Sequence, residues 1–355
     1  MKILHYVDEN RLAWGETWIQ LIKELSRKQI QNHVVCKSGG TLAGRLKEEN
    51  LSFETFDIPI SWLPQTGTKL RKIIKEFSPD VIHTRLSSAA RTAGYWGKRA
   101  GIPVVQTVDK FPKAYYHKDA AFLLTCSESV KLHMEGLGFP ANKISTIFNP
   151  VDSKLYSFDS NEADKARNRL GILPDEKIIL GAGRFVDWKG FDNLIKAYKY
   201  LSDNSQQDVK LLLLGDGEEK EKLLKLIKSF GIEKKVIMPG FVQDIRPYMW
   251  ASDVFVLPSK EPEPFGIVLI EAMASGLASI ATKAGGPVDI IEDGINGCLV
   301  GIDSYKDIAD QLRILLEDEN FRVRIAKTGM DTVMCKFSVG EIAKRHIEIY
   351  SSCCV

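Results

Sequence analysis

The chain has 355 residues, of which 44% are apolar and 26% are charged, and its net charge is +2. This length favours two domains over a single core, and the composition is that of a globular protein rather than a disordered or fibrous one. No stretch approaches the ~20 apolar residues of a membrane-spanning helix, and six cysteines without C-x-x-C spacing predict free thiols in a reducing cytoplasm.

The first half of the chain alternates short apolar runs with amphipathic stretches. Its first run, Met1–Asp8, is too short for a signal peptide and predicts a buried strand. The expected strands are Ile3–Val7, His33–Cys36, Val81–His83, Pro103–Thr107 and Phe122–Thr125. The expected helices are Glu16–Arg27, Gly67–Phe77, Ser87–Arg99 and Glu128–Leu137. Apolar runs that do not alternate and are separated by helices predict a parallel sheet covered on both faces.

Charge is distributed unevenly between the two halves. Residues 1–150 carry 21 Lys and Arg against 14 Asp and Glu, whereas residues 151–355 carry 27 against 32. Either both are ordinary solvated surfaces, or the basic half faces an anionic partner such as phospholipid headgroups. The apolar segments Phe56–Leu63 and Tyr115–Tyr116 lie in this basic half. Exposed segments of this kind would suit an interfacial contact, but we expect these to be buried.

A break in the pattern separates the halves. Asn149–Asp152 and the polar stretch Ser157–Lys165 predict an interdomain linker. The expected division of the chain is 1–155, 156–336 and 337–355. The last of these segments contains a helix, Val339 to Tyr350, that we expect to return to the first domain.

The second half has the same architecture as the first. Its expected strands are Lys177–Gly181, Val209–Leu214, Val236–Met238, Val254–Leu257, Ala278–Ala281 and Cys298–Val300. Its expected helices are Phe191–Leu201, Glu218–Phe230, Val268–Ala274 and Lys306–Leu316. The predicted fold class is therefore α/β, with two doubly wound Rossmann-like domains facing a central cleft. Ligands of such sheets bind at the carboxyl ends of the strands, where the distinctive residues of this chain fall.

A glycine-rich segment with two cations, Gly181–Gly190, begins at the end of a predicted strand. Its glycines allow close backbone approach, and Arg184 and Lys189 can flank one diphosphate. A dinucleotide-binding loop is a weaker interpretation, because Val186 stands where G-x-G-x-x-G has its third glycine. Two ordinary surface cations are the remaining alternative. We favour the diphosphate.

Other features carry weaker signals. Asp216 and Glu218 can hold Mg²⁺, but a glycine turn before a helix explains them better. The sequence contains no D-x-D, which lowers the expectation of a metal-dependent sugar transfer. The turn Gly285–Pro287 either connects two elements or shapes the wall of a donor pocket. Four histidines are expected to be structural rather than catalytic: His5, His83, His117 and His133.

Two glutamates frame the most informative stretch of the chain. Glu263 precedes a Pro-Phe-Gly turn, and Glu271 follows eight residues later. Pro262, Pro264 and Gly266 keep the first part out of a helix, so we expect Glu263 in a loop and Glu271 inside the next helix. The start of that helix presents free N–H groups and a positive dipole end to an anion. Carboxylates for hydroxyls and amides for phosphate together describe a sugar nucleotide.

These segments occur in an order that resembles a known family. They are G-R-x-x-x-x-K-G at 183–190, G-D-G at 215–217, G-F-V at 240–242, A-S-D-V-F-V-L-P-S at 251–259, E-P-F-G-I-V-L-I-E-A-M-A-S-G at 263–276 and G-G-P at 285–287. Their order and spacing resemble the retaining glycosyltransferases of family 4 (glycosyl transferases group 1), which have the GT-B fold. Asn149–Asp152 also resembles the interdomain junction of that family. The likeness extends over almost the whole chain.

The resemblance implies roles for individual residues. Arg184 and Lys189, with Gly183 beside them, would bind the donor diphosphate and stabilise it as the leaving group. Glu263 would accept hydrogen bonds from the transferred sugar, and Glu271 from the ribose. The remaining donor contacts would be the backbone amides of Phe265 and Gly266 to the sugar, those of Ile267 and Val268 to the phosphate, and Val242 near the base.

The chain departs from the family pattern in two places. The Gly-Gly loop after the first strand is replaced by Asn10–Glu16, in which Gly15 is the only glycine and Trp14 adds bulk. Gly15 is still expected to approach the phosphate. Asp109 stands where the family often carries a histidine, and it cannot donate a hydrogen bond as an imidazole does. It is a candidate both for acceptor handling or catalysis and for a structural role.

The function implied by the resemblance is a metal-independent, retaining glycosyltransferase without a cofactor. It would move a sugar from a nucleoside-diphosphate sugar, with a UDP-sugar favoured, to a hydroxyl of a glycan or lipid-linked acceptor in bacterial lipopolysaccharide, capsule or other envelope glycan synthesis. The expected location is the cytoplasm, with peripheral contact to the anionic inner face of the membrane and no nucleic-acid partner. The alternatives are a nucleotide-sugar epimerase of the same fold and a non-catalytic sugar-nucleotide-binding protein, and a dehydrogenase is more distant.

Overall fold

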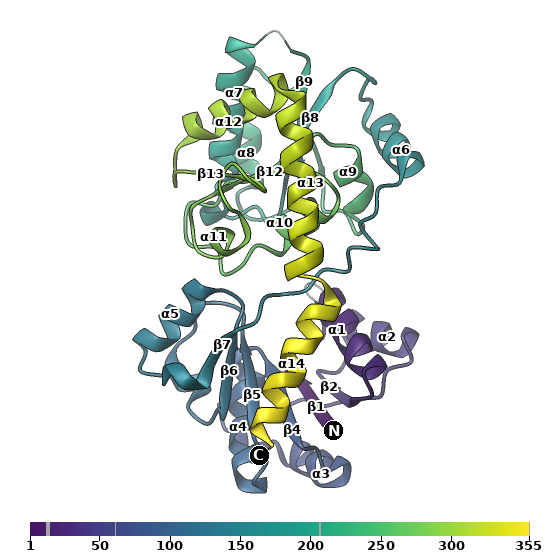
Figure 1. Cartoon of the computed structure of the whole chain (residues 1–355), viewed down its shortest axis with the longest axis vertical. Helices are drawn as coiled ribbons and strands as arrows, with labels where there is room; N and C mark the ends of the chain where they lie inside the picture. The colour runs from purple at the N-terminus through teal and green to yellow at the C-terminus, as the bar shows by residue number, and fades with distance from the viewer. Residues whose placement is uncertain (12–14, 61, 206, 355) are drawn as a thin grey trace. The chain divides into compact units, whose positions relative to one another are not determined.

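A computed structural model describes residues 1–11, 15–60, 62–205 and 207–354 (Figure 1). The chain divides into two compact units. Unit 1 contains Met1–Asp152 together with Phe337–Val355, and unit 2 contains Ser153–Lys336. Each is an α/β unit built on one parallel sheet, as the sequence predicts.

Unit 1 is built on a seven-stranded parallel sheet in the order β3-β2-β1-β4-β5-β6-β7. Its strands are β1 (Lys2–Val7), β2 (Gln31–Cys36), β3 (Phe53–Thr55), β4 (Val81–Arg85), β5 (Val104–Val108), β6 (Phe122–Thr125) and β7 (Ile144–Thr146). Its helices are α1 (Gly15–Arg27), α2 (Gly40–Glu48), α3 (Thr68–Phe77), α4 (Ser87–Ala100), α5 (Glu128–Gly136) and α14 (Val339–Cys353), with short 3₁₀ turns η1 (Pro64–Thr66), η2 (Ala114–His117) and η3 (Ala141–Lys143). All five strands predicted in this half are confirmed.

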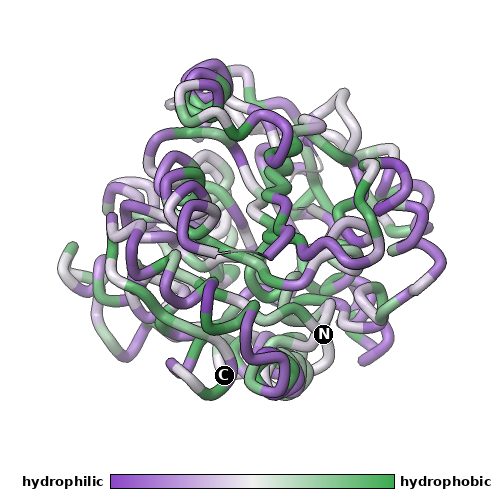
Figure 2. The backbone as a smooth tube through the Cα atoms, turned by 90° about the horizontal axis from the view of Figure 1, so that it is seen from above, coloured by the Kyte–Doolittle hydropathy of each residue, from purple (hydrophilic) through white to green (hydrophobic). Residues whose placement is uncertain are grey.

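Unit 2 is built on a six-stranded parallel sheet in the order β10-β9-β8-β11-β12-β13. Its strands are β8 (Lys177–Ala182), β9 (Val209–Leu214), β10 (Val236–Gly240), β11 (Val254–Leu257), β12 (Ala278–Thr282) and β13 (Cys298–Val300). Its helices are α6 (Ser160–Leu170), α7 (Phe191–Asn204), α8 (Lys220–Ser229), α9 (Arg246–Trp250), α10 (Ile267–Ala274), α11 (Pro287–Ile290), α12 (Tyr305–Glu317) and α13 (Glu319–Lys336), with one 3₁₀ turn, η4 (Asp187–Lys189). In Figure 2 the outer helices alternate between hydrophilic and hydrophobic residues, as expected of helices that cover a sheet with one face.

The prediction that Ser157–Lys165 forms a linker is wrong. Most of this stretch belongs to α6, which begins where the Asp159 side chain accepts a hydrogen bond from the Glu162 amide at 3.1 Å. The buried face of α6 is made only of Ala163 and Ala166. Two alanines among charged residues give almost no apolar periodicity, which is why the segment looks like a linker in the sequence.

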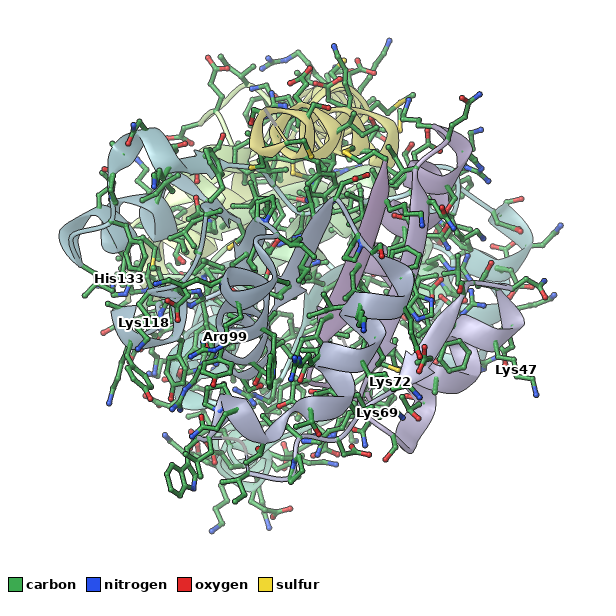
Figure 3. All side chains as sticks on the ribbon, turned by 90° about the horizontal axis from the view of Figure 1, so that it is seen from below. Lys47, Lys69, Lys72, Arg99, Lys118 and His133 are labelled. Carbon is green, nitrogen blue, oxygen red and sulfur yellow. The ribbon has the colours of Figure 1, made fainter. Side chains whose placement is uncertain are left out.

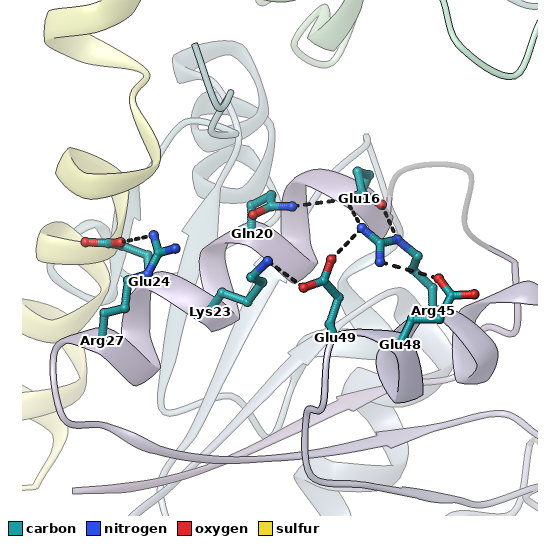
Figure 4. Close-up of polar contacts among 8 residues, drawn as sticks. All are labelled: Glu16, Gln20, Lys23, Glu24, Arg27, Arg45, Glu48 and Glu49. Atoms are coloured by element: carbon teal, nitrogen blue, oxygen red, sulfur yellow. Dashed lines mark hydrogen bonds and ion pairs between the residues drawn. The ribbon is translucent and has the colours of Figure 1, made fainter. Parts of the chain in front are cut away.

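Helix α2, which the sequence analysis missed, is tied to α1 by ion pairs (Figure 4). The Arg45 guanidinium contacts Glu16 at 3.0 Å and Glu49 at 2.5 Å, and Lys23 contacts Glu49 at 2.5 Å. This network fixes the first turn of α1, the helix that begins at Gly15.

Helix α14 completes the core of unit 1. Its Ile342, Ala343 and Tyr350 are buried in one cluster with residues of β1 and α1. The Tyr350 hydroxyl lies 2.7 Å from Nδ1 of His83 on β4, and His83 Nε2 lies 2.7 Å from the Thr107 hydroxyl. The rings of His5 and His346 flank His83 at 5.6 and 5.5 Å between centroids. A buried histidine cluster therefore joins the last helix to the central strands.

We expect this cluster to make unit 1 less stable in acid. Burial lowers the pKa of His5 and His346 to about 4 from 6.5 and lowers the pKa of His83 as well. The unfolded chain therefore binds protons as the pH falls through 6.5 while the folded chain does not, so stability decreases from pH 6.5 toward 4 by up to about 1.4 kcal/mol per pH unit for each histidine. Urea unfolding at pH 7 and pH 5 measures this loss. In His346→Gln one histidine fewer takes up a proton on unfolding, so the loss of unfolding free energy between pH 7 and pH 5 should be smaller. An unchanged pH dependence in this variant would contradict a role for buried His346 in this loss.

Candidate functional site

The cationic segment 183–190 follows β8 and packs against residues 258–260, which follow β11. Gly190 has φ of +69°, and a Cβ at this position would lie 2.0 Å from the Pro258 carbonyl oxygen, so only glycine fits. The Lys260 amide donates to the Trp188 carbonyl at 2.8 Å. These backbone contacts bring η4, with Lys189 at its end, to the segment that carries Glu263.

Lys189 and Glu263 form the central ion pair of this site. Their Nζ and Oε2 atoms are 2.5 Å apart, and the side chains are only 13% and 9% exposed. The Ser259 hydroxyl donates to the same carboxylate oxygen at 3.1 Å, and Thr282 holds Ser259 by donating to its carbonyl oxygen at 2.7 Å. Two donors, one of them a cation, therefore fix this carboxylate oxygen at the carboxyl ends of β11 and β12.

The Gly285–Pro287 turn fixes the backbone of Glu263. The Glu263 amide donates to Ala284 O at 2.9 Å, and the Gly286 amide donates to Glu263 O at 2.7 Å. A Cβ on Gly285 would lie 2.3 Å from Glu263 O, and one on Gly286 would lie 2.3 Å from Phe265 Cα. Two consecutive glycines are thus required by close backbone approach, and the turn is more than a connection.

Helix α10 begins immediately after this turn. Gly266 has φ of +105° and precedes the first helical residue, while Phe265 is buried beneath it. The amides of the half-buried Ile267 and Val268 donate to no acceptor among the described residues. These amides and the helix dipole form a site suited to an anion.

Glu271 lies in α10, one turn after those amides, and is held by a different partner. Its Oε1 accepts a hydrogen bond of 2.8 Å from the Tyr156 hydroxyl. Burial raises the pKa of Glu271 to about 7, and the hydrogen bond from Tyr156 opposes that rise. Glu263 and Glu271 therefore differ in kind: the first is ion-paired, and the second titrates near neutral pH.

The other predicted residues of unit 2 lie at strand ends. Gly183 follows β8, where a Cβ on Gly215 would lie 1.9 Å from its carbonyl oxygen. Arg184 is exposed, and its guanidinium has no hydrogen-bond or ion-pair partner in the described part of the chain. Val242 is half-buried in the loop after β10. Of the predicted site side chains, the structure joins Lys189 to Glu263 by a direct contact.

Asp109 and Gly15 belong to unit 1. Arg85, at the end of β4, binds Asp109 through both carboxylate oxygens, with Nε to Oδ2 at 3.0 Å, and also donates to Asn149 Oδ1 at 2.7 Å. Arg85 is buried and Asp109 partly exposed. Gly15 is the first residue of α1, and Trp14 lies outside the described residues.

Several partners in these contacts were not predicted: Arg85, Asn149, Tyr156 and Ser259. Arg85 had a usable signal, because it ends a strand adjacent to the one that Asp109 follows. Tyr156 had none, because nothing in the sequence relates it to a helix more than 100 residues away.

The weaker sequence signals resolve as structural features. Asp216 binds Lys220 at 2.9 Å and the Gly217 amide at 2.8 Å, which fits a turn before a helix. Across the described residues, no three His, Cys, Asp or Glu side chains gather to hold a metal ion. In the same part of the chain, every helix is too short or too polar to cross a membrane. All six cysteines are free thiols, as predicted.

Two family models match the chain. Residues 15–155 match the model described as Glycosyltransferase Family 4, and residues 162–332 match Glycosyl transferases group 1. The lipopolysaccharide core biosynthesis glycosyltransferase LpsE of Rhizobium meliloti is 25% identical over 358 residues, covering 99% of each chain. The N-acetyl-alpha-D-glucosaminyl L-malate synthase of Bacillus anthracis is 31% identical over 211 residues, covering 59% of this chain and 54% of that protein. The crystal structure of Anabaena HepE in complex with UDP shares the fold, with a TM-score of 0.87 and 24% identity over 99% of this chain and all of that one.

Proposed function

Because this chain belongs to the glycosyltransferases of family 4 and group 1 and has their GT-B fold, we propose that it transfers a sugar from a UDP-sugar to an acceptor hydroxyl with retention of configuration and without a metal. The observation that carries the proposal is the buried Lys189–Glu263 pair beside the first amides of α10, which donate to no acceptor in the described part of the chain. UDP is favoured because Anabaena HepE was solved with it.

The transfer needs charge stabilisation on the leaving diphosphate more than it needs a strong base. Lys189, the exposed Arg184 and the α10 amides supply positive charge that is already in place before the reaction. Glu263 accepts hydrogen bonds from the sugar while its own charge is balanced by Lys189. The C1–O bond to the diphosphate breaks as the acceptor oxygen bonds to C1 on the same face, and the hydroxyl proton passes to the leaving phosphate oxygen.

The donor site is proposed to involve all of the predicted residues of unit 2, with Glu271 at the ribose, Val242 at the base and Gly183 and Phe265 to Val268 around the diphosphate and sugar. Gly15 and Asp109 of unit 1 are proposed to serve the phosphate and the acceptor. Since Arg85 occupies both oxygens of Asp109, this carboxylate acts as a hydrogen-bond acceptor for substrate hydroxyls rather than as a mobile base.

The proposed acceptor is a glycan or lipid-linked glycan of the bacterial envelope, handled at the inner face of the cytoplasmic membrane. LpsE of Rhizobium meliloti is a relative that acts in lipopolysaccharide core biosynthesis. A transferase of lipid-linked acceptors benefits from peripheral contact with the anionic bilayer, which requires a basic surface.

Unit 1 has such a surface. Residues 58–120 hold eleven Lys and Arg against four Asp and Glu, and nine of these eleven cations, all except Arg85 and Arg91, are exposed. Figure 3 shows several of these cations on the face viewed from below, and the ones labelled there are Lys69, Lys72, Arg99 and Lys118. The prediction that the neighbouring aromatic residues are buried is wrong for two of them, because Trp62 is 64% exposed and Tyr115 is 49% exposed. The Arg91 guanidinium lies 4.5 Å from the Tyr115 ring centre and donates to the Trp62 carbonyl, so both aromatic residues flank the same helix, α4.

Reversing this charge is expected to release the protein from vesicles. Each Lys or Arg near an anionic bilayer contributes ~1 kcal/mol, so Lys69→Glu with Lys72→Glu should lower partition onto vesicles containing phosphatidylglycerol at least tenfold, and Trp62→Ala should lower it further. Flotation at low salt measures the bound fraction. The matched control is Lys225→Glu with Lys306→Glu in unit 2, which should leave the bound fraction unchanged. Equal flotation of both double variants would contradict a specific surface.

The transfer itself is tested by incubating the protein with a panel of nucleotide sugars, with and without a membrane extract as acceptor. Transfer of label from a UDP-sugar to extract, unaffected by EDTA, is the expected result. Isomerised donor in the absence of extract would instead indicate an epimerase, and a rise in melting temperature with UDP but no turnover in either arm would indicate a binding protein.

A further inference from the structure

We infer that Tyr156 is a positioning residue for the nucleotide, because its hydroxyl aims the Glu271 carboxylate at the ribose and keeps that carboxylate able to accept hydrogen bonds. The inference rests on the proposed donor site. It assigns a role to a residue outside every motif of the sequence.

Tyr156 is itself firmly held at the start of unit 2. The Trp250 indole donates to its carbonyl oxygen at 3.0 Å, and Arg246 donates to the carbonyl of Leu155 at 3.3 Å. Both donors come from α9. The ring is partly buried, and its hydroxyl reaches Glu271 Oε1 at 2.8 Å. Because the backbone of Tyr156 is anchored at two points, the hydroxyl fixes one oxygen of the carboxylate in space.

The second oxygen of Glu271 remains open. Oε2 accepts no hydrogen bond from the described residues. An ionised carboxylate with one oxygen occupied can accept two hydroxyls of a ribose through its remaining lone pairs. If Glu271 takes up a proton, Oε2 becomes either a hydroxyl donor or a neutral carbonyl oxygen, which accepts hydrogen bonds less strongly than a carboxylate. Either change would weaken its contact with the ribose hydroxyls.

The tyrosine keeps its proton, and the glutamate is the group that titrates. Burial and the neighbouring Glu271 raise the pKa of Tyr156, so its hydroxyl keeps the proton that it donates to the ionised Glu271. Burial raises the pKa of Glu271 to about 7, and the Tyr156 hydrogen bond holds it down. Removing the Tyr156 hydroxyl should therefore raise the pKa of Glu271, so that a smaller fraction of Glu271 is ionised at neutral pH.

The test compares UDP with 2′,3′-dideoxy-UDP, which lacks both ribose hydroxyls, in wild type and Tyr156→Phe. Calorimetric dissociation constants are measured from pH 6 to pH 9. The two nucleotides share the diphosphate, so its own ionisation cancels in the ratio of their affinities. In wild type the preference for UDP should rise through about pH 7 and then level off. In Tyr156→Phe the rise should shift to higher pH, and the preference at pH 7 should fall roughly fivefold if the midpoint moves by about one unit.

Tyr248→Phe is the matched control. It removes a hydroxyl from a buried tyrosine of α9 whose partner, Arg169, lies 3.4 Å away and does not involve Glu271. This variant should keep the wild-type pH profile, whereas Glu271→Gln should flatten it. A Tyr156→Phe profile that superimposes on wild type while UDP still binds would overturn the inference alone. Failure of wild type to bind UDP would overturn the proposed donor and the inference with it.

Discussion

Replacing Lys189 by alanine is expected to lower kcat about 100-fold or more and to destabilise unit 2 at the same time. The catalytic loss follows because a preorganised cation at a developing negative charge typically contributes that much. The loss of stability follows because, among the described residues, Glu263 (9% exposed) keeps only the Ser259 hydroxyl as a side-chain partner, and breaking a buried pair costs about 3–5 kcal/mol. Turnover at saturating donor and urea unfolding measure the two effects.

A double variant separates these two roles of Lys189. Lys189→Met with Glu263→Gln removes both charges, so it should recover most of the lost stability while transfer stays abolished. Lys222→Ala, whose ion pairs are on the surface, is the control and should change neither property by much. Turnover of Lys189→Ala within tenfold of wild type would remove this residue from the mechanism.

Replacing Arg184 by alanine is expected to reduce kcat/KM by about 100-fold with no loss of stability. Arg184 is exposed and has no partner in the described residues, so its removal leaves no buried charge, and surface substitutions of this kind change stability by about 0.5 kcal/mol or less. Steady-state kinetics with the UDP-sugar, together with the melting temperature, measure the two quantities. Lys189→Ala should lose both activity and stability, whereas Arg184→Ala should lose activity alone.

Arg184→Lys retains the charge but loses the planar fork that binds two phosphate oxygens, so it should recover only part of the activity. Arg324→Ala removes another exposed arginine of unit 2 and should change neither the kinetics nor the melting temperature. Wild-type kinetics in Arg184→Ala would mean that this arginine is an ordinary surface cation, which was one of the interpretations left open by the sequence.

The long apolar strands of both sheets could be predicted from the sequence because each is buried on both sides. Val209–Leu214 and Phe122–Thr125 were placed to the residue. Strands β3 and β7, of three residues each at the two edges of their sheet, were missed because each contains polar residues and only one apolar residue. Strand β13 is as short but wholly apolar, and it was predicted. Helix α6 was mistaken for a linker because alanine packing leaves no apolar stripe.

The candidate site could be predicted where one short segment contains both the functional side chains and the residues that fix the backbone around them. The placement of Glu263 in a loop and Glu271 within a helix followed from the prolines and Gly266 between them. The contacts of Lys189 with Glu263 and of Tyr156 with Glu271 join residues 74 and 115 positions apart. The first pair depends on which strand ends lie side by side, and the second joins the turn before α6 to helix α10. No local pattern in the sequence encodes either contact.

Helix α14 gives the chain an unusual order of completion. The core of unit 1 needs Ile342, Ala343 and Tyr350, whereas unit 2 is contiguous from Ser153 to Lys336. During synthesis on the ribosome, residues 1–152 therefore lack the helix that covers part of their sheet until all of unit 2 has been synthesised. We therefore expect unit 1 to finish folding after unit 2, which reverses the usual order of co-translational folding, in which the N-terminal domain folds first.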